Sequence, residues 1–241
     1  MELIILAAGK GSRIFKKINK NKCLINIKGE SLIEKIVKDA ISTNLFKKIK
    51  VVVGYRKSKI KEELNKYNIL YIDNKDFDKK EMLHSLKLGI LDSNDDVVIT
   101  YSDIIFSKKI YFDISKNKIK NYILPIFKNW KSIWRRRKKD ILNDCESLLY
   151  DKNFNLTEIG NKINSVNEPM GQFMGIFYIP RNKLKKTISL INKNSSNKKI
   201  HTTNFINFIT QKKEKILCIP CGYNWYEIDD IEDYRNFIKS D

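Results

Sequence analysis

The residues of this sequence best suited to chemistry lie in a glycine-containing loop near its start. A short apolar run at residues 3–8 is followed by Gly9 and Gly11, then by Arg13 and, further on, by Lys22. Glycines let a backbone turn tightly, and the N–H groups that they leave open can hold phosphate oxygens. Arg13 offers a planar pair of donors and Lys22 a point charge. The pattern predicts a triphosphate site, and the alternative is an ordinary strand and loop with surface lysines.

A carboxylate follows another apolar run later in the chain. Asp103 comes two residues after the end of a predicted strand at residues 96–101. A side chain just past the carboxyl end of a buried strand points into the crevice where open α/β sheets bind ligands. The alternative is a turn or helix-capping aspartate, which is common at strand ends.

The elements that must position these residues alternate between strands and helices. Predicted strands lie at residues 3–8, 49–53, 69–72 and 96–101, and predicted helices at residues 31–42, from residue 58 and at residues 82–91. Ser31 is a predicted helix cap, with Glu34 in the capping-box position. This order predicts an α/β fold, with a mainly parallel Rossmann-like sheet and helices on both faces.

The second half follows a different pattern. Its predicted elements are strands at 121–127 and 171–179, a hairpin over 148–159 turning near 151–153, helices at 181–191 and 202–213, a strand through 219, a segment at 222–229 and a helix from 231. No repeat or linker divides the chain. We expect a single domain in which the middle forms a small β insertion over the binding site.

The composition leaves the class of partner open. The 241 residues carry 47 Lys and Arg against 28 Asp and Glu, a net charge of +19. Such an excess is typical of proteins that bind nucleic acids or anionic substrates. The lysines are spread along the chain, however, with one dense run at 131–139, and the sequence has no recognition helix, RRM or KH signature. We therefore predict neither a nucleic-acid nor a membrane partner.

The cysteines and the apolar segments bear on metal binding and location. Cys218 and Cys221 have the spacing of half a zinc site, but no second pair completes it, so they are better interpreted as residues of a late strand. The N-terminal apolar run is too short for a signal peptide, and no stretch is long enough to cross a membrane. The sequence predicts a cytoplasmic location.

The start of the chain resembles a known fingerprint, L-x-A-G-x-G-[ST]-R followed by a Pro-Lys or Asn-Lys pair. Here it reads as residues 6–13, then Asn21-Lys22, then a turn at residues 29–33 into a helix. It is typical of the sugar-nucleotidyltransferase-like superfamily, which has a GT-A-like fold and joins an NTP to a phosphorylated acceptor. The resemblance implies a nucleotide-binding half at 1–115 and an acceptor-binding, metal-completing half at 116–241. The nucleotide-binding residues that it implies are Leu6, Ala7, Ala8, Gly9, Gly11, Ser12, Arg13 and Ser85.

The resemblance also implies the catalytic residues. Trp225 to Asp229 resemble the W-x-E-I-D segment near the end of cytidylyltransferases, whose aspartate binds magnesium together with the first one. The catalytic residues are then Lys22, Arg13, Asp103 and Asp229, with Asp103 and Asp229 as the Mg²⁺ ligands. Asp230 is the alternative second ligand, and capping of the last helix is its other possible role.

The middle of the chain resembles one branch of that superfamily. Trp130, Trp134 and Arg137 match W-x-x-x-W-x-x-R, and a D-x-x-x-D-x-E pattern follows at residues 140–146. Residues 171–175 and 201–204 extend the match to cytidylyltransferases for phosphocholine, 2-aminoethylphosphonate or a phosphorylated amino-acid amide. The acceptor residues that this implies are Trp130, Trp134, Arg137, Asp144, Glu146, Gln172, Trp225 and Glu227. Core packing is the alternative role for the tryptophans.

The sequence thus predicts a Mg²⁺-dependent cytidylyltransferase that transfers CMP from CTP to a small phosphate or phosphonate and releases pyrophosphate. Its partners would be small-molecule substrates, it would be a monomer or homodimer, and its pathway would be cell-surface polysaccharide or phosphonate biosynthesis. An asparagine that relatives carry before the Ser85-Leu86 pair is missing, which leaves uracil open as the base. The alternatives are a sugar-1-phosphate nucleotidyltransferase that uses UTP or dTTP, a nucleic-acid-binding module, and a regulatory subunit that keeps only the fold.

Overall fold

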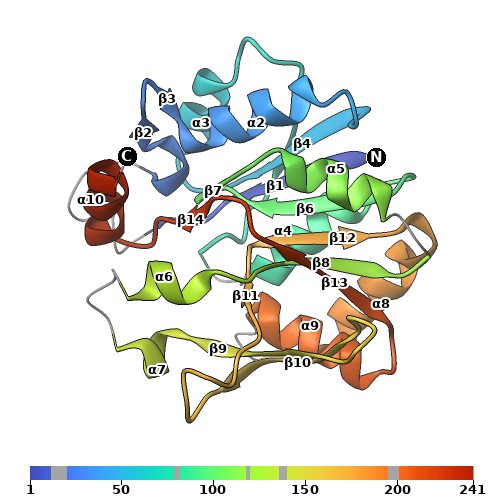
Figure 1. Ribbon diagram of the computed structural model, residues 1–241. Helices are drawn as coiled ribbons and strands as arrows, with labels where there is room; N and C mark the ends of the chain where they lie inside the picture. Colours follow the sequence, from blue (N-terminus) through green and yellow to red (C-terminus); the bar gives the residue numbers. More distant parts are fainter. Residues whose placement is uncertain (12–20, 79–81, 118–119, 136–139, 195–200, 241) are drawn as a thin grey trace.

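The fold is built on one large central sheet (Figure 1). The structure, a computed structural model, describes residues 1–11, 21–78, 82–117, 120–135, 140–194 and 201–240. Over these residues the sheet has eight strands in the order β11-β8-β12-β6-β1-β4-β5, and β13 also pairs with β8. The predicted α/β class with a mainly parallel sheet is confirmed.

Strand β1 (Glu2–Ala7) lies inside this sheet and is apolar on both sides. It pairs in parallel with β4 (Lys48–Val53) and with β6 (Val97–Tyr101). Its side chains alternate between two core clusters, with Leu3 in one and Ile4 in the other. Burial on both faces explains why the strand is a continuous apolar run rather than an alternating one.

The other strands complete the sheet and three small ladders. They are β2 (Asn26–Ile27), β3 (Glu30–Ser31), β5 (Leu70–Asp73), β7 (Ile104–Phe106), β8 (Tyr122–Phe127), β9 (Glu146–Tyr150), β10 (Leu156–Lys162), β11 (Gln172–Phe173), β12 (Ile176–Ile179), β13 (Ile216–Cys221) and β14 (Trp225–Glu227). The pairs β4–β5 and β13–β8 are parallel, whereas β12 runs antiparallel to both β6 and β8. The predicted hairpin is the antiparallel pair β9–β10.

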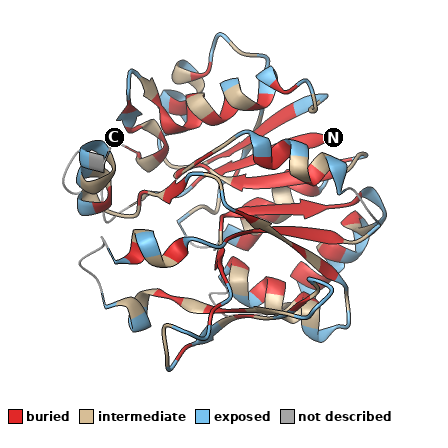
Figure 2. Cartoon of the chain, viewed as in Figure 1, coloured by how far each residue is buried: buried red, intermediate tan, exposed pale blue. Residues whose placement is uncertain are grey.

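Helices cover both faces of the sheet (Figures 1 and 2). One face is covered by α2 (Leu32–Ser42), α3 (Lys57–Glu63) and α5 (Lys109–Lys116). The opposite face is covered by α4 (Met82–Ile90), α8 (Leu184–Asn194) and α9 (Thr202–Gln211). The remaining helical segments are α6 (Trp130–Trp134), α7 (Ile141–Asp144), α10 (Ile231–Ser240) and the 3-10 turns Lys22–Leu24 and Arg181–Lys183.

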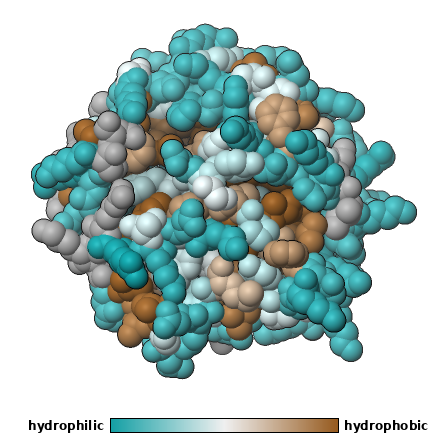
Figure 3. Space-filling view, viewed as in Figure 1, coloured by the Kyte–Doolittle hydropathy of each residue, from teal (hydrophilic) through white to brown (hydrophobic). Residues whose placement is uncertain are grey.

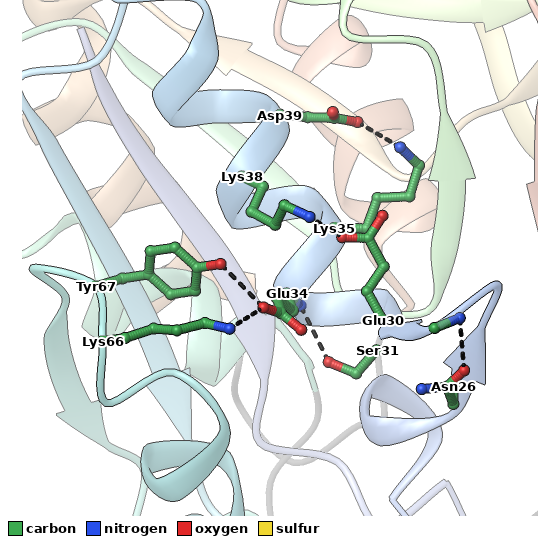
Figure 4. Close-up of polar contacts among 10 residues, drawn as sticks. Asn26, Glu30, Ser31, Glu34, Lys35, Lys38, Asp39, Lys66 and Tyr67 are labelled. Atoms are coloured by element: carbon green, nitrogen blue, oxygen red, sulfur yellow. Dashed lines mark hydrogen bonds and ion pairs between the residues drawn. The ribbon is translucent and has the colours of Figure 1, made fainter.

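The start of α2 forms half of the predicted capping box (Figure 4). The Ser31 hydroxyl accepts a hydrogen bond from the Glu34 backbone N–H at 3.2 Å. The Glu34 carboxylate accepts a hydrogen bond from the Tyr67 hydroxyl at 2.9 Å and pairs with the Lys66 ammonium at 2.6 Å. The hydrogen bond from Lys66 lowers the pKa of Glu34. This carboxylate therefore ties α2 to the segment that follows α3.

Two details differ from the predicted elements. The strand predicted at residues 171–179 is two strands, β11 and β12, separated at Gly175, which has a φ of +73°. Its backbone lies against the Tyr101 ring, and a Cβ there would be 2.9 Å from Tyr101 Cδ2. The sequence pattern also predicts no element over residues 104–116, where the structure has β7 and α5.

The surface and the cysteines are consistent with the composition. Figure 3 shows hydrophilic side chains over most of the viewed face, with apolar ones in separate groups. Within the described ranges, no helix combines the length and the apolar character needed to cross a bilayer. Cys218 and Cys221 lie buried in β13, as predicted, and burial raises the pKa of each thiol to about 12.

Candidate active site

The glycine loop leaves β1 at the carboxyl edge of the sheet, beside the ends of β4 and β6. The Ala8 carbonyl accepts a hydrogen bond from the Tyr55 N–H at 3.1 Å, which joins the loop to the segment after β4. A Cβ on Gly9 would meet no atom within 4 Å, so its backbone borders open space. Gly11 has a φ of +58°, a conformation that glycine adopts without strain. Ser12 and Arg13 lie outside the described residues.

A short ladder brings carboxylates from distant parts of the chain to the same edge. Asp103 directly precedes β7, and Asp229 closely follows β14. The two strands pair antiparallel with Glu227 opposite Ile104, and the Ile228 N–H donates to the Asp103 carbonyl at 3.1 Å. Pairing in this register necessarily places the residue before β7 beside the residues after β14.

Lys22 lies at the centre of this carboxylate group. Its ammonium contacts Asp103 Oδ2 at 2.8 Å and Asp229 Oδ1 at 2.7 Å. One carboxylate oxygen from each of Asp103, Glu227 and Asp229 lies within 4.8 Å of the others. Burial alone would lower the pKa of Lys22, but the charges of these carboxylates outweigh it and raise the pKa above its usual range. Lys22 is therefore a permanent cation held between acidic groups.

The neighbouring Asp230 has a different role. Its Oδ1 accepts hydrogen bonds from the N–H groups of Glu232 and Asp233, at the start of α10. In return, Asp233 Oδ2 accepts from the N–H groups of Asp229 and Asp230, at 3.0 and 3.2 Å. This reciprocal cap satisfies the exposed N–H groups of the helix. It also fixes the backbone of Asp229, so the structure favours Asp229 over Asp230 as the second carboxylate of the site.

A cavity of about 420 Å³ extends from these carboxylates. It is lined by Lys22, Met82, Tyr101, Asp103, Trp134, Asn143, Asp144, Glu146, Gln172, Phe173, Gly175, His201, Thr202, Thr203, Trp225, Glu227 and Asp229. Six of the eight predicted acceptor residues are among them, while Arg137 lies outside the described residues and Trp130 does not line the cavity. The cavity is markedly acidic, although the chain as a whole carries a charge of +19.

The three tryptophans pack together, and their arrangement corrects the prediction for Trp130. The Trp134 and Trp225 rings lie parallel, with centroids 5.9 Å apart and planes 6° apart. Trp130 contacts Trp134 edge-on from behind and is only 1% exposed. Trp130 is therefore a core residue that packs against Trp134, which was the alternative role given for the tryptophans.

Ser85, predicted to bind the nucleotide, lies buried in α4. Its hydroxyl accepts a hydrogen bond from the Asn74 side chain at 2.9 Å, and Asn74 Oδ1 accepts from the Asp76 N–H at 3.0 Å. This contact ties the segment after β5 to the helix. In this structure Ser85 therefore holds the segment after β5 in place.

Sequence reasoning gave no role to the three hydroxyl residues of the cavity, Tyr101, Thr202 and Thr203. Tyr101 ends β6, two residues before Asp103, and Thr202 begins α9. Burial raises the pKa of Tyr101, the neighbouring Thr202 hydroxyl opposes this, and the charges of nearby carboxylates raise it further. Tyr101 therefore stays protonated and can donate a hydrogen bond. Its position at the end of a predicted strand was the available signal.

Comparisons with known proteins agree with this geometry. Residues 3–115 match the MobA-like NTP transferase domain. The chain is 28% identical, over 258 aligned positions, to a CTP:phosphoglutamine cytidylyltransferase from Campylobacter jejuni, covering 99% of this chain and all of the relative. The fold is similar to that of an inositol-1-phosphate CTP transferase from T. maritima, with a TM-score of 0.77, 20% identity and coverage of 99% and 94%.

A second solved structure has the same fold. It is a CTP:phosphocholine cytidylyltransferase from Streptococcus pneumoniae, with a TM-score of 0.75, 18% identity and coverage of 99% of this chain and 98% of the other. The glycine loop, the converging carboxylates and these matches agree with one another: residues 3–115 match the MobA-like NTP transferase domain, and the whole chain has the fold of nucleotidyltransferases.

Proposed function

We propose that this protein is a cytidylyltransferase that transfers CMP from CTP to a small acceptor bearing a phosphate or phosphonate. The observation that carries the proposal is the position of Lys22 between Asp103 and Asp229, close to the glycine loop. CTP is supported by the relatives, whose names specify CTP as the nucleotide. Each of those names also specifies a phosphorylated acceptor, which is phosphoglutamine, inositol 1-phosphate or phosphocholine.

The proposed reaction is an in-line displacement at phosphorus. An oxygen of the acceptor phosphate attacks the α-phosphorus of CTP, and a new P–O bond forms. The bond between the α-phosphorus and the oxygen that bridges to the β-phosphate breaks, and that oxygen leaves with the electron pair as part of pyrophosphate. The attacking oxygen is already anionic, so no general base is needed. Catalysis then depends on positioning and on charge neutralisation.

The residues of this chain divide that work between them. Lys22 would hold an α-phosphate oxygen, because its charge is permanent and it lies nearest the carboxylates. The N–H groups around Gly9 and Gly11, with Arg13, would hold the β- and γ-phosphates. Asp233 acts as a positioning residue, since it fixes the backbone of Asp229.

Magnesium fits the acidic group of this site. The oxygens of Asp103, Glu227 and Asp229 converge within 4.8 Å, and carboxylate oxygens are the ligands that Mg²⁺ prefers, with phosphate oxygens and water completing an octahedron. Asp103 and Asp229 would hold the ion. When bound, it would offset the negative charge that develops on the triphosphate.

The lining of the cavity favours a cationic acceptor over a sugar phosphate. Glu146 and Glu227 line it together with the stacked faces of Trp134 and Trp225. Carboxylates and aromatic faces both attract an ammonium group. We therefore propose an acceptor with an amine, quaternary amine or amino-acid amide.

Pyrophosphate release tests the proposal. The full chain is assayed with Mg²⁺ and CTP against phosphocholine, 2-aminoethylphosphonate, glutamine phosphorylated on its amide, and glucose 1-phosphate. UTP and dTTP replace CTP in parallel assays, and Lys22→Met is the control for contaminating activity. Turnover of an amine-bearing acceptor with CTP is expected. Rapid turnover of glucose 1-phosphate with UTP or dTTP, and none with CTP and amines, would contradict the proposal.

The other expectations remain predictions. The partners are small-molecule substrates, without nucleic acid or membrane, and the enzyme is a cytoplasmic monomer or homodimer. Its product would enter cell-surface polysaccharide or phosphonate biosynthesis.

A further inference from the structure

The N-terminus of α9 opens into the acceptor cavity. His201, Thr202 and Thr203, at the first turn of this ten-residue helix, all line the cavity. The His201 side chain does not cap the helix, and the first turn contains no acidic residue. The first backbone bond of the helix is from the Phe205 N–H to the His201 carbonyl. Among the described residues, the N–H groups of Thr202 and Thr203 have no acceptor, and such a helix end attracts an anion.

A buried hydroxyl at the same point independently indicates a ligand. Thr202 is 4% exposed, and its Oγ1 makes no hydrogen bond of acceptable geometry with any described residue. The hydroxyl of Tyr101 lies beside it. A buried hydroxyl without a partner is unfavourable, which makes each such group a candidate contact for a bound molecule. Thr202 and Tyr101 can both donate to an oxygen placed between them and the helix.

The carboxylate side chain of Glu146 lies in the same part of the cavity. Glu146 lines the cavity and lies close enough to Tyr101 for its charge to affect that phenol. Within the described part of the chain, the Glu146 carboxylate has no ion pair. The Gln172 side chain donates to the Glu146 backbone carbonyl at 3.1 Å, which fixes the start of β9. A site for a cation therefore lies near a site for an anion, at the part of the cavity that Tyr101 and Thr202 line.

From this arrangement we infer that the acceptor is a phosphorylated amino acid with its α-ammonium and α-carboxylate groups intact. The carboxylate is bound by the first turn of α9 and the hydroxyls of Thr202 and Tyr101, and the ammonium by Glu146. The phosphate lies toward Lys22. The inference rests on the proposed function and narrows its acceptor, because choline and aminoethyl compounds have no carboxylate to place at α9.

Pairs of acceptors that differ only by the carboxylate give the first test. One pair is O-phosphoserine and phosphoethanolamine, and the other is glutamine phosphorylated on its amide and the corresponding phosphorylated 4-aminobutyramide. With CTP and the full chain, the member with the carboxylate should have a kcat/KM higher by about tenfold or more, the effect of one charge-assisted hydrogen bond.

Two substitutions in α9 give the second test. Thr202→Val removes the hydroxyl but keeps the shape, and should raise the KM for the carboxylate-bearing acceptor by about tenfold, without changing the KM for CTP. Thr203→Asp places a negative charge in the first turn, where it stabilises the helix but repels a carboxylate. The Thr203→Asp variant should therefore fold normally, but it should no longer prefer the carboxylate-bearing member of each acceptor pair. Thr210→Val is the matched control, since Thr210 bonds the Ile206 carbonyl at the far end of α9.

The outcomes separate this inference from the proposed function. Equal kcat/KM values within both pairs, or a preference that survives Thr203→Asp, would overturn the amino-acid acceptor while CTP turnover stands. If no acceptor of either kind consumes CTP, the proposed function fails, and the inference fails with it.

Discussion

Lys22 and Asp229 are 207 positions apart in the chain, yet the Lys22 ammonium lies 2.7 Å from Asp229 Oδ1. The same ammonium lies 2.8 Å from Asp103 Oδ2. The lysine thus occupies the space between two carboxylates that we propose as magnesium ligands. Binding of the ion and of the lysine to these oxygens should therefore compete.

Replacing Lys22 tests this relationship. Lys22→Met keeps the aliphatic stem but removes the charge, and it should lower kcat by about a hundredfold or more while CTP still binds. Because the carboxylates lose their cation, Mg²⁺ alone should raise the melting temperature of this variant more than that of the original protein. Lys35→Met, on the exposed part of α2, is the control. A variant with near-normal kcat would exclude Lys22 from the site.

Substitution of Asp229 should affect activity, whereas substitution of the adjacent Asp230 should affect stability. Asp229→Asn, like Asp103→Asn, should abolish turnover without unfolding the protein, since the amide cannot replace a charged ligand. Asp230→Ala removes the cap of α10 and should lower the free energy of unfolding by about 1 kcal/mol, with activity retained. Pyrophosphate release and urea unfolding measure the two effects. Loss of activity in Asp230→Ala alone would show that the ligand assignment is wrong by one residue.

Substitution of Gly9 and of Gly54, near the proposed nucleotide site, should also have different effects. Gly9→Ala meets no atom within 4 Å, so the fold should be unaffected, whereas a triphosphate against this backbone would be displaced and the KM for CTP should rise. At Gly54, a Cβ would lie 2.6 Å from Phe77 Cβ and 2.8 Å from the Ala8 carbonyl oxygen. Gly54→Ala should therefore destabilise the protein itself. A Gly9→Ala variant with an unchanged KM for CTP would count against the phosphate loop.

Fluorination of the tryptophans tests the cationic acceptor without creating a cavity. Each added fluorine weakens the negative face of the ring, so the KM for an ammonium-bearing acceptor should rise in steps while the KM for CTP stays constant. Trp130→Phe is the control and should leave the acceptor KM unchanged, because Trp130 packs against Trp134 and does not line the cavity. A constant acceptor KM across the series would show that Trp134 and Trp225 act only by packing.

A buried ion pair at the opposite end of β1 should make stability depend on pH. Glu2 Oε2 lies 2.7 Å from the Lys50 ammonium, and Ser93 bonds both groups. Burial alone would raise the pKa of Glu2, but the hydrogen bonds from Lys50 and Ser93 outweigh it and lower the pKa below 4.5. The pair's contribution is therefore complete above pH 4.5 and is lost as the pH falls through the lowered pKa.

Glu2→Gln leaves Lys50 buried without its partner and should cost about 3–5 kcal/mol at pH 7. The difference from the original protein should shrink as the pH falls below 4.5, because Glu2 then becomes neutral as well. Urea unfolding at a series of pH values measures it. A difference that is independent of pH would refute the role of the ion pair.

The elements with strong local signals could be predicted from the sequence. The spacing of Leu83, Leu86 and Ile90 predicted α4, and all three are buried in the core. Ser31 was predicted as a helix cap, and it caps α2. In both cases the information lies within one or two turns of the chain, where side-chain periodicity and capping chemistry operate.

The pairing that completes the site could not be predicted in this way. Strands β7 and β14 have three residues each, and neither carries a periodic pattern long enough to identify its partner. Similarly, Trp130 and Trp134 are identical residues four positions apart, and only the tertiary packing decides which one lines the cavity. Asp229 was assigned by resemblance, and the only local feature that distinguished it from Asp230 was the expected capping of the last helix by Asp230.

If Asp229 is a metal ligand as proposed, the β7–β14 ladder also determines when during synthesis the enzyme can become active. A growing chain that has not yet reached residue 225 already contains β1, the glycine loop, Lys22 and Asp103, but it lacks Glu227 and Asp229. Pairing across so long a sequence separation is a late event in folding. A nascent chain could thus hold a nucleotide without consuming it, and catalysis would begin only after the last strand has closed onto β7.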